Sequence, residues 1–215
     1  VVFADPIFVN SVLNTFYLGF GAALLGTVFA ALVAYVSVRT KYRLRGALDF
    51  LSWLPASIPG IILGLGLLWM FLRVPIFNPL YGTIGVLIMA VFFASLTTGV
   101  QLIKSNMIQL GFDLEEASTV AGGSWFYTFR NVVFPILGNV LLSVGILIFA
   151  SATRNVANIA MLVTNRNRPL SMLQVDYMVE GIFEPAAIVG VITVAITCGM
   201  AMLAVAFGKR IGFRL

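Results

Sequence analysis

Five long runs of apolar residues, separated by short polar segments, dominate the chain. They cover approximately residues 12–38, 50–72, 80–103, 132–153 and 186–208. Each run is close to the roughly 20 residues that an α-helix needs to cross a hydrocarbon core of about 30 Å. The runs are apolar all round and show no alternation of polar and apolar residues, which favours helices over membrane-barrel strands. The sequence therefore predicts an all-α membrane protein, a bundle of about five transmembrane helices in a single domain, 1–215.

The composition supports a membrane environment. Hydrophobic residues make up 60% of the chain and charged residues 10%, whereas soluble domains carry about 25% charged residues. The net charge of +5 does not indicate nucleic-acid binding, because the basic residues form short clusters between apolar runs. The chain has no histidine and one cysteine, Cys198, so neither a metal site nor an internal disulfide is predicted.

The basic residues predict the orientation in the membrane. Nine of the thirteen fall in three segments that must share one side: Arg39, Lys41, Arg43, Arg45, Lys104, Arg130, Lys209, Arg210 and Arg214. The other side has Arg73, Arg154, Arg166 and Arg168. The positive-inside rule places the first group in the cytoplasm. We therefore expect a multi-pass protein of the cell inner (plasma) membrane, with the N-terminus of this segment outside and its C-terminus inside.

The second apolar run contains two prolines and a pair of closely spaced glycines. Pro55 and Pro59 predict a kink or local break, because proline removes a backbone donor. Gly60 and Gly64 allow helices to approach closely in lipid. Two interpretations stay open: the segment only packs helices, or it lines a solute pathway. Pro59 and Gly60 are candidate pathway residues in the second case.

The polar segment 104–131 is long for a connection between spans. Asp113 followed by Glu116 has the pattern of a helix capping box, and the pair Gly122-Gly123 would end that helix. The serine that follows would cap a second short helix. Helices this short do not stand alone in water. The segment is therefore either an amphipathic element on the membrane surface or a rigid peg that docks into a partner.

This segment resembles the EAA loop of ATP-binding-cassette importer permeases. The family pattern reads Glu-Ala-Ala, three residues, Gly, nine residues and Ile-x-Leu-Pro. Here Glu116-Ala117-Ser118, Gly122 and Val132-Val133-Phe134-Pro135 keep the same spacing. The resemblance implies the fold of a type I importer permease, in which the cytoplasmic loop 104–131 carries a coupling helix that fits a groove on an ATP-binding subunit. The residues it implies for ATPase coupling are Asp113, Glu115, Glu116, Ala117, Ser118, Ala121, Gly122, Trp125 and Arg130.

A second stretch resembles the ferric-iron-type permeases of that family. Arg154-Asn155-Val156-Ala157 stands where those proteins have Arg-Glu-Leu-Ser, and Arg168-Pro169-Leu170-Ser171 follows at the same separation. The resemblance implies the C-terminal half of a fused permease and makes ferric iron a candidate solute, beside phosphonates, polyamines and other small solutes. Asn155 removes a hard oxygen ligand from an iron pathway. Candidate pathway residues here are Arg154, Asn155 and Asn158, with Arg154 alternatively an interfacial anchor.

The expected function is that of a transport subunit and not of an enzyme. The sequence contains no GxxxxGK[ST] motif, so ATP and magnesium are expected on a cytoplasmic partner and no cofactor on this chain. The other expected partners are a second permease half or subunit, an extracytoplasmic solute-binding protein and the lipid bilayer. The alternatives are a secondary transporter, which usually needs ionisable residues within its spans, and a membrane-embedded enzyme, for which Ser143, Ser151 and Cys198 have no histidine partner.

Overall fold

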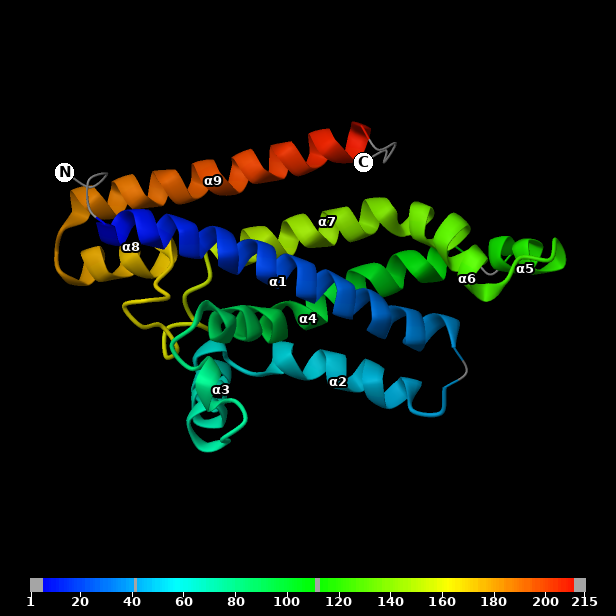
Figure 1. Ribbon diagram of the computed structural model, residues 1–215, viewed down its shortest axis with the longest axis horizontal. Coiled ribbons are helices and arrows are strands. Elements are labelled where there is room, and N and C mark those ends of the chain that lie inside the picture. The colour runs from blue at the N-terminus through cyan, green and yellow to red at the C-terminus, as the bar shows by residue number, and fades with distance from the viewer. Residues whose placement is uncertain (1–5, 41, 111–112, 211–215) are drawn as a thin grey trace.

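The computed structural model describes residues 6–40, 42–110 and 113–210. Four long helices run along the molecule: α1 (Pro6–Arg39), α4 (Ile84–Gln109), α7 (Phe134–Thr153) and α9 (Phe183–Arg210). Figure 1 shows them extended along its long axis. Within the described residues these four are long and apolar enough to cross a membrane, and the bent pair α2–α3 would make a fifth span. The prediction of an all-α membrane bundle is confirmed.

Helix α1 lies at the centre and packs against both α4 and α7. Its buried face is built from small residues spaced three or four apart: Gly19, Ala22, Gly26, Ala30 and Ala34. A methyl group added at Gly19 would lie 2.5 Å from the ring of Phe149, and one at Gly26 would lie 2.9 Å from Ile148. Small residues thus bring the helix backbones close together, which is how helices associate in lipid.

The second apolar run forms two helices instead of one span over 50–72. Helix α2 (Arg45–Ser57) and helix α3 (Gly60–Arg73) meet at an angle of 109°. Ile58 is extended, with φ −100° and ψ 124°, because the residue before a proline is kept out of the helical region. Pro59 then precedes the first residue of α3. The break therefore lies at Pro59, and Pro55 lies inside α2, in its last turn.

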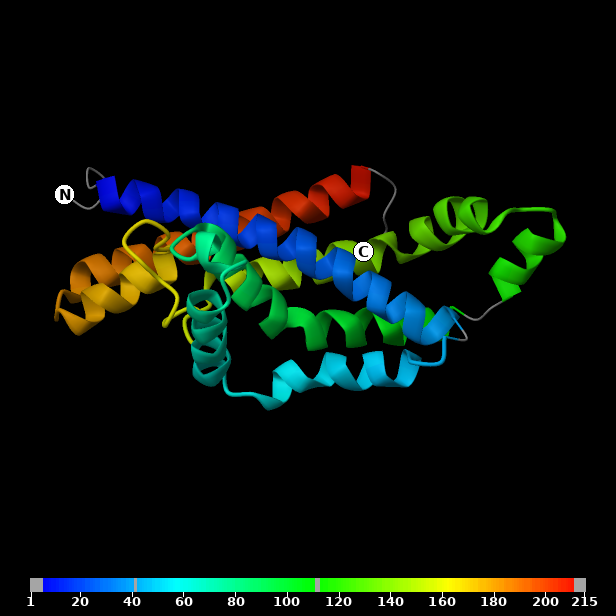
Figure 2. The same cartoon turned by 60° about the horizontal axis from the view of Figure 1, so that its bottom comes forward.

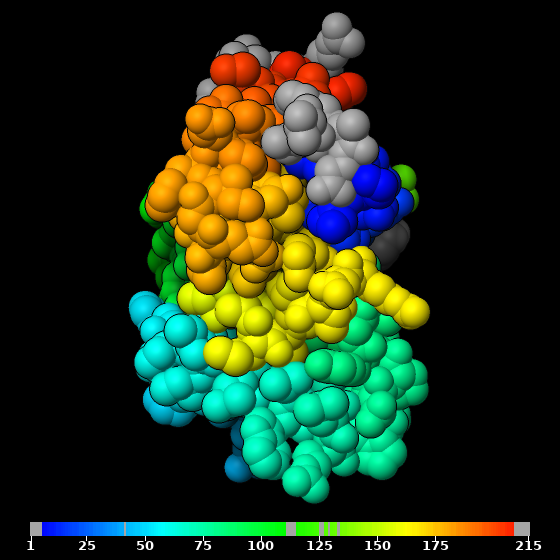
Figure 3. Space-filling model, turned by 90° about the vertical axis from the view of Figure 1, so that its left-hand side faces the viewer, coloured from blue at the N-terminus to red at the C-terminus, as the bar shows by residue number. Residues whose placement is uncertain are grey.

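The remaining elements are short and gather at the two ends of the bundle. They are η2 (Asn78–Leu80), α5 (Asp113–Val120), α6 (Trp125–Thr128), the π-helical turn η3 (Phe129–Val133) and α8 (Leu170–Val179). Figure 2 shows α5 and α6 projecting beyond the bundle at the end opposite the N-terminus. The other end, seen in Figure 3, carries the segment 154–169 (yellow) between the α8–α9 region (orange) and the α3–η2 region (teal).

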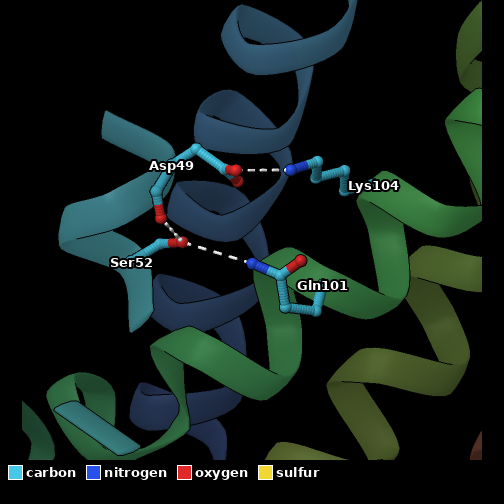
Figure 4. A network of polar contacts seen from close by, with 4 residues as sticks. All are labelled: Asp49, Ser52, Gln101 and Lys104. Carbon is cyan, nitrogen blue, oxygen red and sulfur yellow. Dashed lines mark hydrogen bonds and ion pairs between the residues drawn. The ribbon is translucent and has the colours of Figure 1, made fainter. Parts of the chain in front are cut away.

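A polar network joins α2 to α4 (Figure 4). Lys104 Nζ lies 2.6 Å from Asp49 Oδ2, and Gln101 Nε2 donates to Ser52 Oγ over 3.4 Å. The Ser52 backbone carbonyl also accepts a 2.6 Å hydrogen bond from Thr97 Oγ1. Lys104 was predicted to begin the cytoplasmic loop, but α4 continues to Gln109. Pairing with Asp49 neutralises its charge within the helix.

Candidate functional site

The corner between α5 and α6 is closed by a Schellman motif. The Gly122 N–H donates to the Thr119 carbonyl over 3.0 Å, and the Gly123 N–H donates to the Ser118 carbonyl over 2.9 Å. Gly122 has φ +85°, the left-handed conformation that the sequence predicted. Gly123 was predicted to share that conformation but does not. Gly123 has to lack a side chain for a steric reason instead, since a methyl group there would lie 2.6 Å from Ser118 Oγ.

Side-chain hydrogen bonds hold α5 and α6 together as one unit. The hydroxyls of Ser118 and Thr128 lie 2.8 Å apart across the corner. Ser124 Oγ accepts a 3.3 Å hydrogen bond from the Tyr127 N–H, as expected of the residue that caps α6. Helix α5 begins at Asp113 itself. The side chains of Asp113 and Trp125, and with them the predicted capping contact of Asp113, lie outside the described residues.

One ion pair connects α5 to the end of the central helix. Glu115 Oε1 lies 2.9 Å from Arg39 Nε, and Arg39 Nη2 also donates to the Met107 carbonyl in the last turn of α4 over 3.1 Å. The Arg39 side chain is 3% exposed and that of Glu115 22% exposed. Arg39 therefore joins α5 to both α1 and α4. In the sequence, Arg39 indicates only the orientation, because the 76 positions that separate it from Glu115 give no local signal.

The predicted coupling residues divide into an inner and an outer group. Glu115 and Ser118 are half-buried and bonded to Arg39 and Thr128 respectively. The outer group is exposed: Glu116, Ala117, Ala121, Gly122 and Arg130. Two large apolar side chains of the same corner are also exposed, Val120 by 89% and Tyr127 by 57%. The outer group and these two side chains form the surface that we call the α5–α6 tip.

At the other end of the bundle, three of the five candidate pathway residues pack tightly together. Asn155 Oδ1 accepts hydrogen bonds from the Asn158 backbone N–H (3.2 Å) and from Asn158 Nδ2 (3.1 Å). A methyl group at Gly60 would lie 2.9 Å from Asn158 Oδ1, and one at Gly64 would lie 2.7 Å from the Asn158 carbonyl. The glycines of α3 thus let it pack on the segment 154–169. Pro59 is exposed at the start of α3.

Arg154, the fifth candidate, lies apart from this cluster. It follows the last residue of α7 and lines a cavity between α4 and α7. The α4 residues of that cavity, from Ala94 to Leu102, come from the middle of the helix and not from its end. Arg154 directly follows the fourth span, as the sequence predicts, and borders a cavity that extends along the middle of α4.

Several known proteins resemble this chain in sequence. No family model matches the chain. It is 29% identical over 186 residues to the ferric transport system permease protein FbpB of Actinobacillus pleuropneumoniae, covering 86% of this chain and 27% of that protein. It is 26% identical over 215 residues to the sulfate transport system permease protein cysT of Chlorella vulgaris, covering 94% of this chain and 80% of that protein. The chain thus spans about a quarter of the ferric-type relative's length.

A solved structure shares the fold. In the crystal structure of a bacterial alginate ABC transporter in complex with alginate pentasaccharide-bound periplasmic protein, the matched chain superposes with a TM-score of 0.79 at 15% identity. The match covers 98% of this chain and 81% of that one. The chain thus resembles transport-system permeases in sequence and shares the fold of an ATP-binding-cassette transporter chain. The expected family is thereby confirmed, and so is the prediction of a multi-pass membrane protein.

Residues outside the predicted sets complete both candidate sites. Arg39 and Thr128 hold α5 and α6, and the hydroxyls of Thr98 and Ser151 share the cavity of Arg154. None of these four contacts is predicted from the sequence. Their only sequence signal is position: Arg39 ends a span, and Ser151 lies three residues before Arg154, on the same face of a helix.

Proposed function

We propose that the chain is a permease subunit of an ATP-binding-cassette importer that forms half of a solute pathway. In this proposal the α5–α6 tip contacts a separate cytoplasmic ATP-binding subunit, which binds ATP and magnesium and supplies the energy. A second permease half or subunit completes the pathway. The chain itself carries out no chemical reaction, in line with relatives that are named as transport subunits.

The observation that carries the proposal is the ion pair between Glu115 and Arg39. A displaced α5 would pull on the end of α1 through a contact of 2.9 Å with a side chain that is almost fully buried. Helix α1 packs against α4 and α7, so movement at its end reaches the core of the bundle. The Schellman turn and the Ser118–Thr128 contact make the corner stiff enough to transmit force.

The surface of the α5–α6 tip suits a protein partner. Val120 and Tyr127 expose apolar area on a segment that projects beyond the bundle, and contiguous exposed apolar area is typical of an interaction site. Glu116 adds an exposed negative charge beside it. Ala117 and Ala121 are small and exposed, so a partner can approach the helix backbone closely.

The outer end provides the second partner surface in this proposal. The similar alginate transporter is described in complex with a periplasmic protein, and we assign a solute-binding protein to the exposed end formed by α8 and the segment 154–169. The names of relatives give ferric iron and sulfate as candidate solutes. In this proposal the orientation is the one that the basic residues predict, so the α5–α6 tip lies on the cytoplasmic side of an inner membrane.

Co-purification with the ATP-binding subunit tests the proposal. Glu116→Lys reverses a charge on the tip and should lower the amount of ATPase recovered with the permease. Glu180→Lys makes the same change on an exposed residue at the opposite end and should leave the recovery unchanged. Full recovery of ATPase with the Glu116 variant, in membranes that contain normal amounts of permease, would contradict the proposed contact.

A further inference from the structure

A cavity of about 230 Å³ lies between α4 and α7. Since one water molecule takes up about 30 Å³ in the liquid, this space holds a small ion with part of its hydration shell. Its walls are mostly apolar, but four polar residues face it: Ser95, Thr98, Ser151 and Arg154. They come from two helices, so the cavity gathers polar groups that the sequence separates.

The positive charge of Arg154 has no counterion among the described residues. It has no ion pair or hydrogen bond with any described residue. Arg168, by contrast, lies 3.1 Å from Asp176, and Arg73 lies over the ring of Trp69. Arg154 also borders a second cavity of about 470 Å³, beside Gln174 and Thr193. The guanidinium thus stands between two open spaces.

The position of the cavity makes the charge of Arg154 significant. The cavity lies against the middle of α4, a helix that is long enough to span the membrane. A charged side chain at membrane depth is costly, and such residues usually face a water-filled path or a ligand.

The remaining polar groups of the cavity are hydrogen-bond donors. The hydroxyls of Thr98 and Ser151 have no hydrogen-bond partner among the described residues. Ser95 Oγ already donates within α4, to the carbonyls of Val91 and Phe92. Neither α4 nor α7 contains aspartate or glutamate. A guanidinium beside free hydroxyls matches the donor geometry that binds oxyanions, and a hard cation would find no carboxylate ligand on these two helices.

We propose that this cavity is a binding site for a small oxyanion on the solute pathway, with Arg154 as its charged donor and Thr98 and Ser151 as neutral donors. The inference rests on the proposed function as a permease. Between the two solutes in the relatives' names, it favours a sulfate-like anion over free ferric ion. The headgroup of an anionic lipid offers the same chemistry and is distinguished below.

A reporter cysteine on the cavity wall measures binding directly. Leu147 lines the cavity without being one of the donors. We would place Leu147→Cys in a Cys198→Ser background, purify the permease with its ATPase in maltoside detergent, and follow alkylation by a thiol reagent. Sulfate at ten times its Kd should slow alkylation by about tenfold, since the free fraction falls as 1/(1 + [L]/Kd). Chloride at equal ionic strength should not.

Two controls identify the site. Arg154→Gln should weaken protection by sulfate by roughly tenfold to a hundredfold, the range for a hydrogen bond to a charged group. Arg166→Gln removes a charge from an exposed residue that uses only its backbone carbonyl, and should leave protection intact. A second reporter, Leu24→Cys, lies in the apolar groove between α1, α7 and α9 and should not be protected.

Three results would overturn the inference. They are the absence of protection by sulfate or phosphate, equal protection in Arg154→Gln, and protection that appears only in nanodiscs of phosphatidylglycerol without added sulfate, which would assign the site to a lipid headgroup. Recovery of ATPase in the same preparation separates this test from the proposed function. If the ATPase is recovered and protection is missing, only the oxyanion site fails. If the ATPase is not recovered, the proposed function fails.

Discussion

At the scale of single residues, Gly122 shows how local backbone chemistry fixes the α5–α6 tip. Its φ of +85° is unfavourable for any residue with a Cβ, while the space around it is open. Gly122→Val should therefore strain the backbone by about 1–2 kcal/mol without a steric clash, and should open the corner. We expect ATP-driven uptake to be lost while the amount of permease in the membrane stays normal.

A graded series makes this prediction sharper. Gly122→Asn should keep more uptake than Gly122→Val, because asparagine tolerates the left-handed conformation better than a β-branched residue does. Uptake is measured in vesicles energised with ATP, and the amount of permease by quantitative blotting. Normal uptake with the valine variant would show that the corner does not need its observed conformation.

Glu115 and Glu116 are adjacent carboxylates for which the structure predicts different effects. Glu115→Gln removes the negative charge that lies 2.9 Å from the buried Arg39 guanidinium and should lower the free energy of unfolding by about 1–3 kcal/mol. Glu116→Gln changes an exposed side chain and should stay within about 0.5 kcal/mol of the parent. Unfolding of the purified chain in detergent measures both values, and a double-mutant cycle with Arg39→Met isolates the pair. Equal losses at the two positions would refute the ion pair.

At the scale of elements, α3 depends on close approach to the segment 154–169. A methyl group at Gly64 would lie 2.7 Å from a backbone carbonyl, which cannot rotate away, whereas one at Gly66 would meet nothing within 4 Å. Gly64→Ala should therefore destabilise the protein by about 1–3 kcal/mol. Gly66→Ala, the matched control on the same helix, should be neutral or slightly stabilising. Thermal unfolding in detergent should separate the two variants, and equal midpoints would argue against this packing.

The elements themselves were largely predictable from the sequence. Apolar runs of membrane length located the spanning helices, and Pro55 and Pro59 located the break between α2 and α3. The glycine that ends α5 and the serine that caps α6 were also correct. These features depend on a few neighbouring residues, so they can be inferred locally. The apolar run 80–103 did not reveal that α4 continues to Gln109, with Lys104 paired in the helix to Asp49, 55 positions away.

At the scale of the whole molecule, the features that the sequence did not reveal depend on how the helices are offset along their axes. Arg154 follows the fourth span, yet it borders a cavity that extends along the middle of α4, because α4 and α7 pack side by side. Likewise, Arg39 meets Glu115 because α1 and α5 reach the same level. Hydropathy gives the length of a span but not its offset, so neither contact could be derived before the structure.

The orientation of the molecule provides the last prediction. Val120 at the α5–α6 tip and Val179 at the end of α8 are 89% and 82% exposed and lie at opposite ends of the bundle. In a Cys198→Ser background, Val179→Cys should react with a membrane-impermeant thiol reagent added to intact cells whose outer membrane has been made permeable. Val120→Cys should react only after the inner membrane is opened. In cells that lack the ATP-binding subunit and the solute-binding protein no partner covers these two exposed side chains, so failure to react reports the membrane barrier and not burial. Reaction of Val120→Cys before the inner membrane is opened would place the tip outside, where no cytoplasmic ATPase can reach it.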